Sequence, residues 1–375
     1  MLDVRHGSNK CLNFCSTNLY YCFRVTIAYF SVSGLDVLGA ISSVSLDLRS
    51  RIIEWIYRLQ VHPDKNSKYF SGTPPRLPQT GDKLDPPNNH YRCGHLAMTY
   101  TGLCILLALG DDLSRLNRKA LVEGVKALQT EEGNFAATLS GCESDMRFVY
   151  CAACISYMLN DWSGFNIERA TDYIIKSIGY DYGIAQCPEL ESHGGTTFCA
   201  LATLSLTNQL DKLSEQQVEG LKRWLLFRQV DGFQGRPNKP VDTCYSFWVG
   251  ASLKILDMLQ YSNYGSNRRY VYETQDTVVG GFSKWPDTCT DPMHTYLGLA
   301  GLSLIGENGL LEIEPTLNIT KRAYEHLKSI HEKWASESYC FYCNKCFRTQ
   351  LHYGYERESS LNYRDIYISN VAGAR

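Results

Sequence analysis

The sequence repeats with a period of 49 residues, and this period restricts the possible folds more than any other feature. A glycine followed closely by an apolar residue recurs along the chain, with the apolar members at Phe135, Ile184, Phe233 and Phe282. A small residue inside an apolar run recurs at the same interval, at Cys104, Ala153, Ala202, Ala251 and Ala300. Because two separate features share one period, we predict a repeat protein in which each unit is one supersecondary structure.

Each repeat has the pattern of a turn, an apolar helix, a short connection and an amphipathic helix. Residues 294–304 are apolar nearly all round, which is typical of a buried helix. Residues 213–228 mix charged and polar side chains with Leu and Trp, which is typical of a half-exposed helix. Strand signals are sparse. About six such hairpins with buried inner helices predict an all-α fold, an α–α toroid (α6/α6 barrel), rather than an open solenoid.

The expected domain organisation is one toroid domain with a short segment at each end. We assign residues 24–335 to the toroid domain, and residues 1–23 and 336–375 to atypical terminal segments. The proline pairs at 74–75 and 86–87 indicate a loop before the regular repeats. The spacing of Cys340, Cys343 and Cys346 would suit a metal knuckle, but no second paired motif accompanies it. We therefore interpret this stretch as a tail without a metal site.

Composition excludes several classes of protein. Of the 375 residues, 44% are hydrophobic and 20% are charged, which allows a large core and excludes a globally disordered chain. The formal net charge of −2 provides no field that would attract nucleic acid or an anionic membrane. No nucleic-acid partner is expected, and any anionic ligand must be held by a local cluster of basic residues.

The cysteines indicate a reducing compartment. There are 15 of them, an odd number, and they lie in apolar stretches such as residues 150–154 and 198–200, where buried free thiols are expected. Together with the absence of a secretory signal, this pattern predicts a cytoplasmic protein. The apolar run over residues 24–41 includes Arg24, Ser31, Ser33 and Asp36, so we predict an amphipathic helix and no transmembrane segment.

Polar residues gather at one level of the predicted toroid. Positions one period apart should lie at the same height on neighbouring inner helices. One layer contains His193, Asp242 and Asp291, and the layer three residues further on contains Arg147, Thr196, Tyr245 and His294. These residues begin apolar helices, where unpaired buried charge would be costly. The sequence therefore predicts a functional site at one rim.

Asp242, Cys244 and His294 are candidate metal ligands at this rim. His294 follows Cys244 by about one period, so the two should begin adjacent inner helices. Carboxylate, thiolate and imidazole all bind zinc, and three protein ligands leave a fourth position open for catalysis. A purely structural interpretation also exists, with Asp242 as a helix cap and the other two as core residues. The shared phase of the three residues favours the metal site.

A cluster of anion-binding groups precedes the metal candidates. Arg236 and Lys239, together with His193 and Tyr245, suit a diphosphate, although a solvated basic loop would have the same composition. Aromatic residues lie deeper in the same helices, at Tyr150, Phe198, Phe247 and Trp248. They indicate either an apolar funnel for a ligand or ordinary core packing.

Four stretches, residues 145–150, 193–199, 235–248 and 280–287, resemble the β subunits of protein geranylgeranyltransferase type I. The resemblance extends over about residues 24–335. It implies one zinc ion and obligate pairing with an α subunit shared with farnesyltransferase. It also implies transfer of geranylgeranyl from geranylgeranyl diphosphate to the cysteine of a C-terminal Cys-aliphatic-aliphatic-X motif, where X is usually Leu. Small GTPases of the Rho, Rac and Rap type are the expected protein substrates.

The resemblance also assigns individual roles. The metal ligands correspond to Asp242, Cys244 and His294, and the diphosphate-binding set to His193, Arg236, Lys239 and Tyr245. The isoprenoid tunnel corresponds to Arg147, Tyr150, Cys199 and Trp248, with Phe30 and Met293 near the pocket for X. Zinc would activate the substrate thiol, and the basic residues would stabilise charge on the leaving diphosphate.

Two positions distinguish this chain from farnesyltransferases. Thr26 stands where farnesyltransferases carry a bulky Trp, so a small residue would admit the longer lipid. Lys284 stands where farnesyltransferases use an Asp to hold magnesium, so Lys284 joins the catalytic residues and Mg²⁺ is not expected to be required. The alternatives are a farnesyltransferase β subunit, a non-catalytic toroid scaffold, and a terpene cyclase. The last would need an Asp-x-Asp-Asp motif, whose third Asp is missing at Asp111-Asp112.

Overall fold

The computed structural model describes residues 24–60, 94–139 and 143–352, with side chains up to residue 337. Both proline pairs, residues 1–23, and the side chains of Cys340, Cys343 and Cys346 lie outside the described residues. The chain divides into two units, Met1–Leu327 and Lys328–Arg375. The first unit contains the repeats, and the second contains the later part of one helix.

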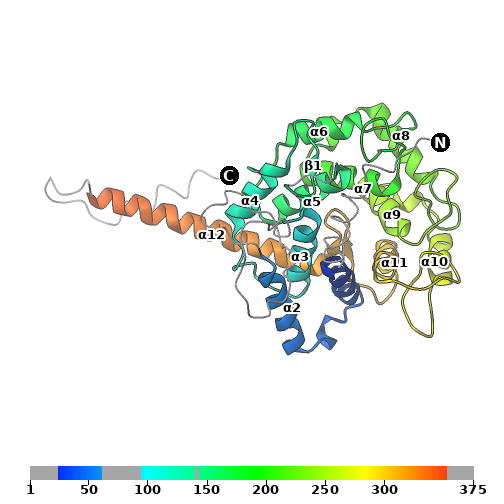
Figure 1. The fold of residues 1–375 in the computed structure, drawn as a ribbon, viewed down its shortest axis with the longest axis horizontal. Helices are drawn as coiled ribbons and strands as arrows, with labels where there is room; N and C mark the ends of the chain where they lie inside the picture. Colours follow the sequence, from blue (N-terminus) through cyan, green and yellow to red (C-terminus); the bar gives the residue numbers. More distant parts are fainter. Residues whose placement is uncertain (1–23, 61–93, 140–142, 353–375) are drawn as a thin grey trace, which may run out of the picture. The chain divides into compact units, whose positions relative to one another are not determined.

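Inner and outer helices alternate along the first unit (Figure 1). The inner helices are residues 24–37, α3 (Leu96–Ala108), α5 (Met146–Met158), α7 (Gly194–Leu206), α9 (Tyr245–Ile255) and α11 (Pro292–Leu304). The outer helices are α2 (Leu46–Arg58), α4 (Arg118–Leu128), α6 (Ile167–Lys176), α8 (Glu215–Leu226) and α10 (Tyr264–Glu273), followed by α12 (Lys321–His352), which continues into the second unit. Short 3₁₀ turns occur at η1 (Ile41–Ser43), η2 (Leu210–Lys212) and η3 (Leu259–Tyr261).

Strands are short in the described residues, as the sequence predicted. β1 (Phe135–Ala136) pairs antiparallel with β2 (Ser144–Asp145), and β3 (Ile313–Glu314) pairs with β4 (Ile319–Thr320). Isolated bridges link Ala185 to Ser192, Gln234 to Val241 and Ser283 to Thr290, again one period apart. Each bridge stabilises the turn that leads into an inner helix.

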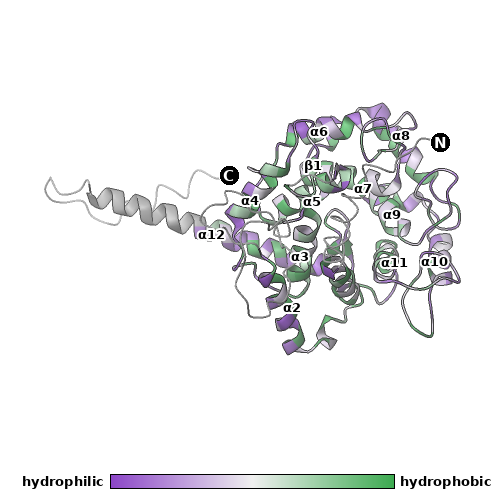
Figure 2. Cartoon of the chain, viewed as in Figure 1, coloured by the Kyte–Doolittle hydropathy of each residue, from purple (hydrophilic) through white to green (hydrophobic). Residues whose placement is uncertain are grey.

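Hydrophobic patterning explains the two layers (Figure 2). Nearly every residue of α7 and α11 is buried, whereas α6 buries one stripe that includes Ala170, Tyr173 and Ile174. Side chains cap the outer helices, and Ser214 forms a capping box with Gln217 at the start of α8. The inner helix expected over residues 294–304 begins two residues earlier, at Pro292, and the outer helix expected over 213–228 is α8 preceded by η2.

The inner helices form a closed ring. α3 packs against α5, α5 against α7, α7 against α9, and α9 against α11. The helix over residues 24–37 closes the gap, because the ring of its Tyr29 contacts Tyr100 of α3 and Tyr296 of α11 at centroid distances of 6.0 and 5.4 Å. Its hydroxyl donates to the Asn318 carbonyl at 2.8 Å. The predicted α–α toroid is confirmed.

One backbone hydrogen bond recurs between successive repeats. It runs from the N–H at the start of an inner helix to a carbonyl in the next repeat's turn: Leu96 to Ala137 (3.0 Å), Met146 to Gln186 (3.0 Å), Gly194 to Gly235 (2.7 Å) and Thr243 to Lys284 (3.2 Å). The four acceptors are 49 residues apart. The bond therefore fixes each turn against the beginning of the preceding inner helix.

A polar side chain accepts a backbone N–H at the start of each inner helix from α3 to α11; it belongs to the N-cap residue in four of them and precedes the N-cap residue Cys244 in α9. The residues that accept the N–H two residues further on are His95, Asp145, His193, Asp242 and Asp291. The bond satisfies a backbone donor that the helix itself leaves unpaired. Ionisable side chains are thereby held at one end of the ring, which is the rim predicted from the sequence.

Two further expectations concern the environment of the chain. Cys151, Cys154 and Cys199 are buried free thiols, as predicted. Among the described residues, no helix combines the length and apolar character needed to cross a membrane.

An ion pair between a buried carboxylate and a half-exposed arginine joins the two ends of the ring. Asp36 is 2% exposed and accepts hydrogen bonds from Thr320 Oγ1 at 2.6 Å and from Arg322 Nη2 at 2.6 Å. Burial raises the pKa of Asp36, and Thr320 and Arg322 oppose this effect. The carboxylate therefore depends on its partners to remain charged.

We predict that Arg322→Ala lowers the free energy of unfolding by about 3 kcal/mol, because it leaves a buried carboxylate without its counter-ion. Lys321→Ala is the matched control. Lys321 pairs with Glu312 at 2.6 Å, and both side chains are half-exposed. Loss of this pair should lower the free energy of unfolding by less than about 1 kcal/mol. Thermal unfolding of both variants measures the difference. Equal shifts would show that Asp36 does not depend on this pair.

Candidate metal centre

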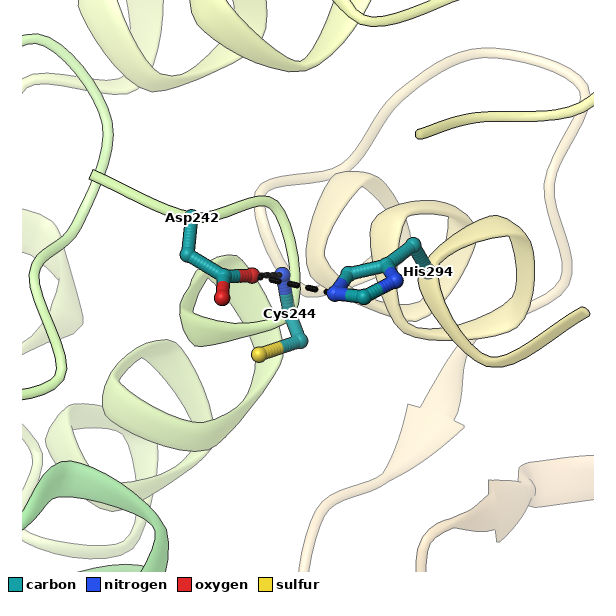
Figure 3. Close-up of side chains that lie close together, drawn as sticks. All are labelled: Asp242, Cys244 and His294. Atoms are coloured by element: carbon teal, nitrogen blue, oxygen red, sulfur yellow. Dashed lines mark hydrogen bonds and ion pairs between the residues drawn. The ribbon is translucent and has the colours of Figure 1, made fainter. Parts of the chain in front are cut away.

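Asp242, Cys244 and His294 meet where α9 and α11 begin (Figure 3). Asp242 precedes α9, Cys244 is its N-terminal cap residue, and His294 lies in the first turn of α11. One potential ligand atom from each residue lies within 4.8 Å of the other two, and all three residues are buried. The structure thus brings together the three candidate ligands that the repeat phase selected.

Asp242 accepts the N–H of Cys244, the cap residue of α9, and also faces the imidazole. Its Oδ1 accepts the Cys244 N–H at 3.0 Å and lies 3.3 Å from His294 Nε2. Burial alone would raise the pKa of Asp242, but the nearby imidazole of His294 and the hydrogen bonds from Cys244 bring it below its ordinary value. The residue is therefore a carboxylate at neutral pH and offers oxygen ligands.

His294 is oriented by Asp291, a carboxylate one turn away. Its Nδ1 lies 2.5 Å from Asp291 Oδ2, while Asp291 Oδ1 caps α11 through the Met293 and His294 N–H groups. A carboxylate on Nδ1 directs the lone pair of a neutral imidazole to Nε2. Sequence reasoning placed Asp291 in the right layer but did not give it this role. The signal was the spacing Asp-x-x-His at a helix start.

The Nε2 atom of His294 provides the test of fit for a metal. It is fully buried and has no hydrogen-bond partner of acceptable geometry among the described residues. Such an orphaned group costs about 1–3 kcal/mol unless something binds it. It points toward Asp242 and Cys244 in Figure 3. A cation held by all three residues would satisfy it, so these residues fit a metal ion.

The Cys244 thiol is not an ionised nucleophile by itself. Burial raises the pKa of Cys244 well above its ordinary value, and the neighbouring Asp242 carboxylate adds to the effect. A bound cation reverses this preference, because thiolate is the form that binds metals. Cys244 therefore suits a ligand role.

Lys284 lies beside the ligand set. Its Nζ is 3.7 Å from Asp242 Oδ2 and 4.3 Å from the centroid of the Trp285 ring. Two periods earlier, Gln186 occupies the equivalent position and its amide donates to the cap carboxylate Asp145 at 2.6 Å. In both repeats the side chain at this position of the turn therefore contacts the carboxylate at the start of the preceding inner helix. At Lys284 that side chain is a cation.

His193 and Tyr245 form a pair next to the metal candidates. His193 Nδ1 accepts the Gly195 N–H at 3.0 Å, and its Nε2 lies 2.9 Å from Tyr245 Oη. Burial and the charge of Arg236 lower the pKa of His193 to about 4, so the ring is neutral. With Nδ1 as an acceptor, Nε2 carries the hydrogen and donates it to Tyr245. The hydroxyl hydrogen of Tyr245 is then available to an incoming anion.

Gly235 makes room for Tyr245. A Cβ atom at this position would lie 2.0 Å from Tyr245 Cζ. The next residue, Arg236, is half-exposed and pairs with Glu191 at 2.8 Å, and Lys239 is exposed on the same turn. The sequence indicated both cations. It did not indicate the close approach of Gly235 to Tyr245 or the ion pair of Glu191 with Arg236, because neither contact follows from the 49-residue period.

The aromatic residues behind this rim form a series of contacts. Ring centroids lie 5.2 Å apart for Tyr150 and Phe198 and again for Phe198 and Trp248, while Phe30 lies 6.0 Å from Tyr296. Phe198 and Phe247 are fully buried, as core residues are. Partial exposure is shared by Thr26, Phe30, Trp248 and Met293.

Two other predicted pocket residues have clear environments. Arg147 is half-exposed and pairs with Asp145 at 2.7 Å and with Glu143 at 2.5 Å. Cys199 is buried, and burial raises the pKa of its thiol well above the ordinary value. Cys199 therefore remains a neutral, apolar surface. The lipid-binding and diphosphate-binding roles of all these residues stay predictions.

Comparison with known proteins identifies the class. Residues 8–319 match the family model of the prenyltransferase alpha-alpha toroid domain, so the chain belongs to the prenyltransferase α–α toroid family. The domain boundaries at residues 24 and 335 stay predictions.

Within this family the chain is similar to type-1 β subunits. The geranylgeranyl transferase type-1 subunit beta of Dictyostelium discoideum is 35% identical over 313 residues, which is 80% of this chain and 88% of the relative. The Arabidopsis thaliana protein of that name is 38% identical over 311 residues, 79% of this chain and 82% of the relative. A solved structure, Candida albicans protein geranylgeranyltransferase-I complexed with GGPP, superposes with a TM-score of 0.72 at 29% identity and covers 82% of this chain and 91% of that chain. The resemblance stated from the sequence is confirmed.

We predict that Asp291→Asn weakens metal binding about 10–100-fold, because an orienting carboxylate is lost from the ligand His294. Asn caps a helix as well as Asp does, so the start of α11 is preserved. Asp287→Asn, an exposed position in the same loop, is the control and should bind metal as the wild type does. Chelator competition measures both affinities. Equal affinities in the two variants would show that His294 does not need Asp291.

Proposed function

We propose that this chain is the catalytic β subunit of a heterodimeric protein prenyltransferase. It transfers geranylgeranyl from geranylgeranyl diphosphate to the cysteine of C-terminal Cys-aliphatic-aliphatic-X motifs, as in small GTPases. The observation that carries the proposal is the buried Asp242–Cys244–His294 cluster with its orphaned Nε2, next to cations and an available hydroxyl. Similarity to type-1 β subunits over most of the chain supports the choice of reaction.

The donor set is appropriate for zinc. One thiolate, one imidazole and one carboxylate are a common zinc combination, and three protein ligands leave a position open for a substrate. Bound there, zinc would lower the pKa of a substrate thiol so that the thiolate forms at neutral pH. The proposed stoichiometry is one zinc ion per β subunit.

The remaining rim residues would hold the lipid diphosphate. Tyr245 offers its hydrogen, His193 fixes the orientation of that hydroxyl, and Arg236 and Lys239 supply positive charge on the adjacent turn. A bond forms between the substrate sulfur and C1 of the lipid while the C1–oxygen bond breaks and diphosphate leaves. The thiol hydrogen is released to solvent. Groups aimed at the developing charge usually make the largest contribution to such a reaction.

Lys284 gives this site its own cation. Its Nζ stands beside Asp242 and is half-exposed, so it can reach the leaving diphosphate. A fixed ammonium there performs the task for which a magnesium ion would otherwise be needed. We therefore expect that the reaction does not require Mg²⁺.

The partner and the compartment belong to the same proposal. The named relatives are subunits, so an α subunit is the expected partner, and the solved neighbour was complexed with GGPP. The buried free thiols suit a reducing compartment such as the cytoplasm.

Co-expression with a prenyltransferase α subunit tests the proposed function. The purified heterodimer should contain one zinc ion and should prefer the twenty-carbon over the fifteen-carbon lipid diphosphate when both compete. Cys244→Ala should lose zinc and activity, while Cys289→Ala, which removes an exposed free cysteine, should lose neither. A heterodimer without zinc would indicate a non-catalytic scaffold. Preference for the fifteen-carbon donor would indicate a farnesyltransferase.

A second prediction concerns lipid length. Thr26→Trp should lower kcat/KM for the twenty-carbon donor more than for the fifteen-carbon donor, because a bulky ring would shorten the lipid site. Ile27→Trp is the control, since the neighbouring side chain is 47% exposed and should tolerate the ring. Competition between the two donors gives the ratio directly. An unchanged ratio in Thr26→Trp would remove Thr26 from the specificity residues.

A further inference from the structure

Thr243 lies between two candidate ligands, Asp242 and Cys244, and its side chain is completely buried. Its Oγ1 donates to the Ser283 carbonyl at 2.7 Å and lies 3.2 Å from the Lys284 carbonyl and 3.1 Å from Thr274 Oγ1. Its own N–H donates to the Lys284 carbonyl at 3.2 Å. One residue thus fastens the backbone at Lys284 to the ligand-bearing segment through both its main chain and its side chain.

Three other repeats form the equivalent backbone bond without a hydroxyl. In the equivalent positions of the other repeats stand Leu96, Met146 and Gly194. These residues make the same backbone bond to the next turn, and they have no side-chain donor. The extra bond therefore occurs where the next turn carries Lys284, beside the metal candidates. This coincidence points to a role in the chemistry rather than in the fold.

The bond controls where the Lys284 ammonium can reach. Tyr270 Oη lies 3.4 Å from the same carbonyl and donates to Val241 at 2.9 Å, so the backbone of Lys284 is held from two sides. The lysine side chain is long and half-exposed, and its Nζ has the contacts with Asp242 and Trp285 described above. Since a flexible side chain is located mainly by its backbone, releasing that backbone would spread the Nζ positions.

We propose that Thr243 is a positioning residue for prenyl transfer, which holds the main chain of Lys284 so that its ammonium meets the leaving diphosphate. This inference rests on the proposed function. Lys284 acts on charge that develops only in the transition state, so misplacing it lowers kcat and leaves KM for the lipid donor nearly unchanged.

Thr243→Val tests the inference in the heterodimer, because valine keeps the shape and removes the hydroxyl. We expect kcat to fall about tenfold, with KM for the lipid donor and the zinc content unchanged. Thr243→Ser, which restores the hydroxyl, should return kcat to within about twofold of wild type. Thr171→Val is the matched control. Thr171 is also buried, at 6% exposure, but its hydroxyl bonds to Ile167 within α6, so kcat should remain at the wild-type value.

A double-mutant cycle separates positioning from general stabilisation. If Thr243 acts through Lys284, adding Thr243→Val to Lys284→Ala causes no further loss of kcat. Independent, multiplicative losses would overturn the inference, as would wild-type kcat in Thr243→Val or in Lys284→Ala. Loss of zinc from Thr243→Val would overturn it too, because Thr243 would then act on the ligands. If Thr243→Val does not assemble, Thr243→Ala takes its place in the cycle.

Different results would contradict the proposed function and the inference about Thr243. A wild-type heterodimer that transfers no lipid contradicts the proposed function and the inference with it. An active heterodimer in which the two losses are independent contradicts the inference alone.

Discussion

The backbone hydrogen bond between successive repeats is the constraint on which the site depends. It joins the start of each inner helix to the turn of the next repeat, and its acceptors recur every 49 residues. Lys284 is thereby brought next to Asp242, and Gly235 next to His193, across about forty positions of sequence. Because both ends of each bond are main-chain groups, the side chains at these positions can vary without loss of the fold. The toroid thus fixes these positions in space, and the side chains at these positions determine the chemistry.

Carboxylates at the starts of the inner helices can take a functional as well as a structural role. Asp145 and Asp242 both accept an N–H two residues further on, and each receives a side chain from the following turn. Around Asp145 the result is a salt bridge with Arg147. Around Asp242 the neighbours are Cys244, His294 and Lys284, so the carboxylate at this position becomes a candidate ligand. The starts of α7, α9 and α11 also direct their partial positive charges to this rim, which favours an anionic substrate.

The sequence predicted the toroid and the three candidate ligands because both depend on the period, which is a one-dimensional property. It did not predict the partners that orient them. The bond from Asp291 to His294 depends on a rotamer, the close approach of Tyr245 to Gly235 depends on packing, and the bonds of Thr243 depend on the path of a neighbouring turn. Asp242 is not the cap residue of α9, which is Cys244; its carboxylate accepts the Cys244 N–H and still lies within reach of a metal shared with Cys244 and His294.

We propose that Asp242, Cys244 and His294 hold a zinc ion whose open position receives the substrate cysteine. X-ray absorption at the zinc edge of the heterodimer tests this arrangement, because sulfur ligands can be counted before and after a Cys-aliphatic-aliphatic-Leu peptide is added. We expect one sulfur ligand, from Cys244, in the free enzyme and a second sulfur in the complex with peptide. A sulfur count that does not change when the peptide binds would contradict this arrangement.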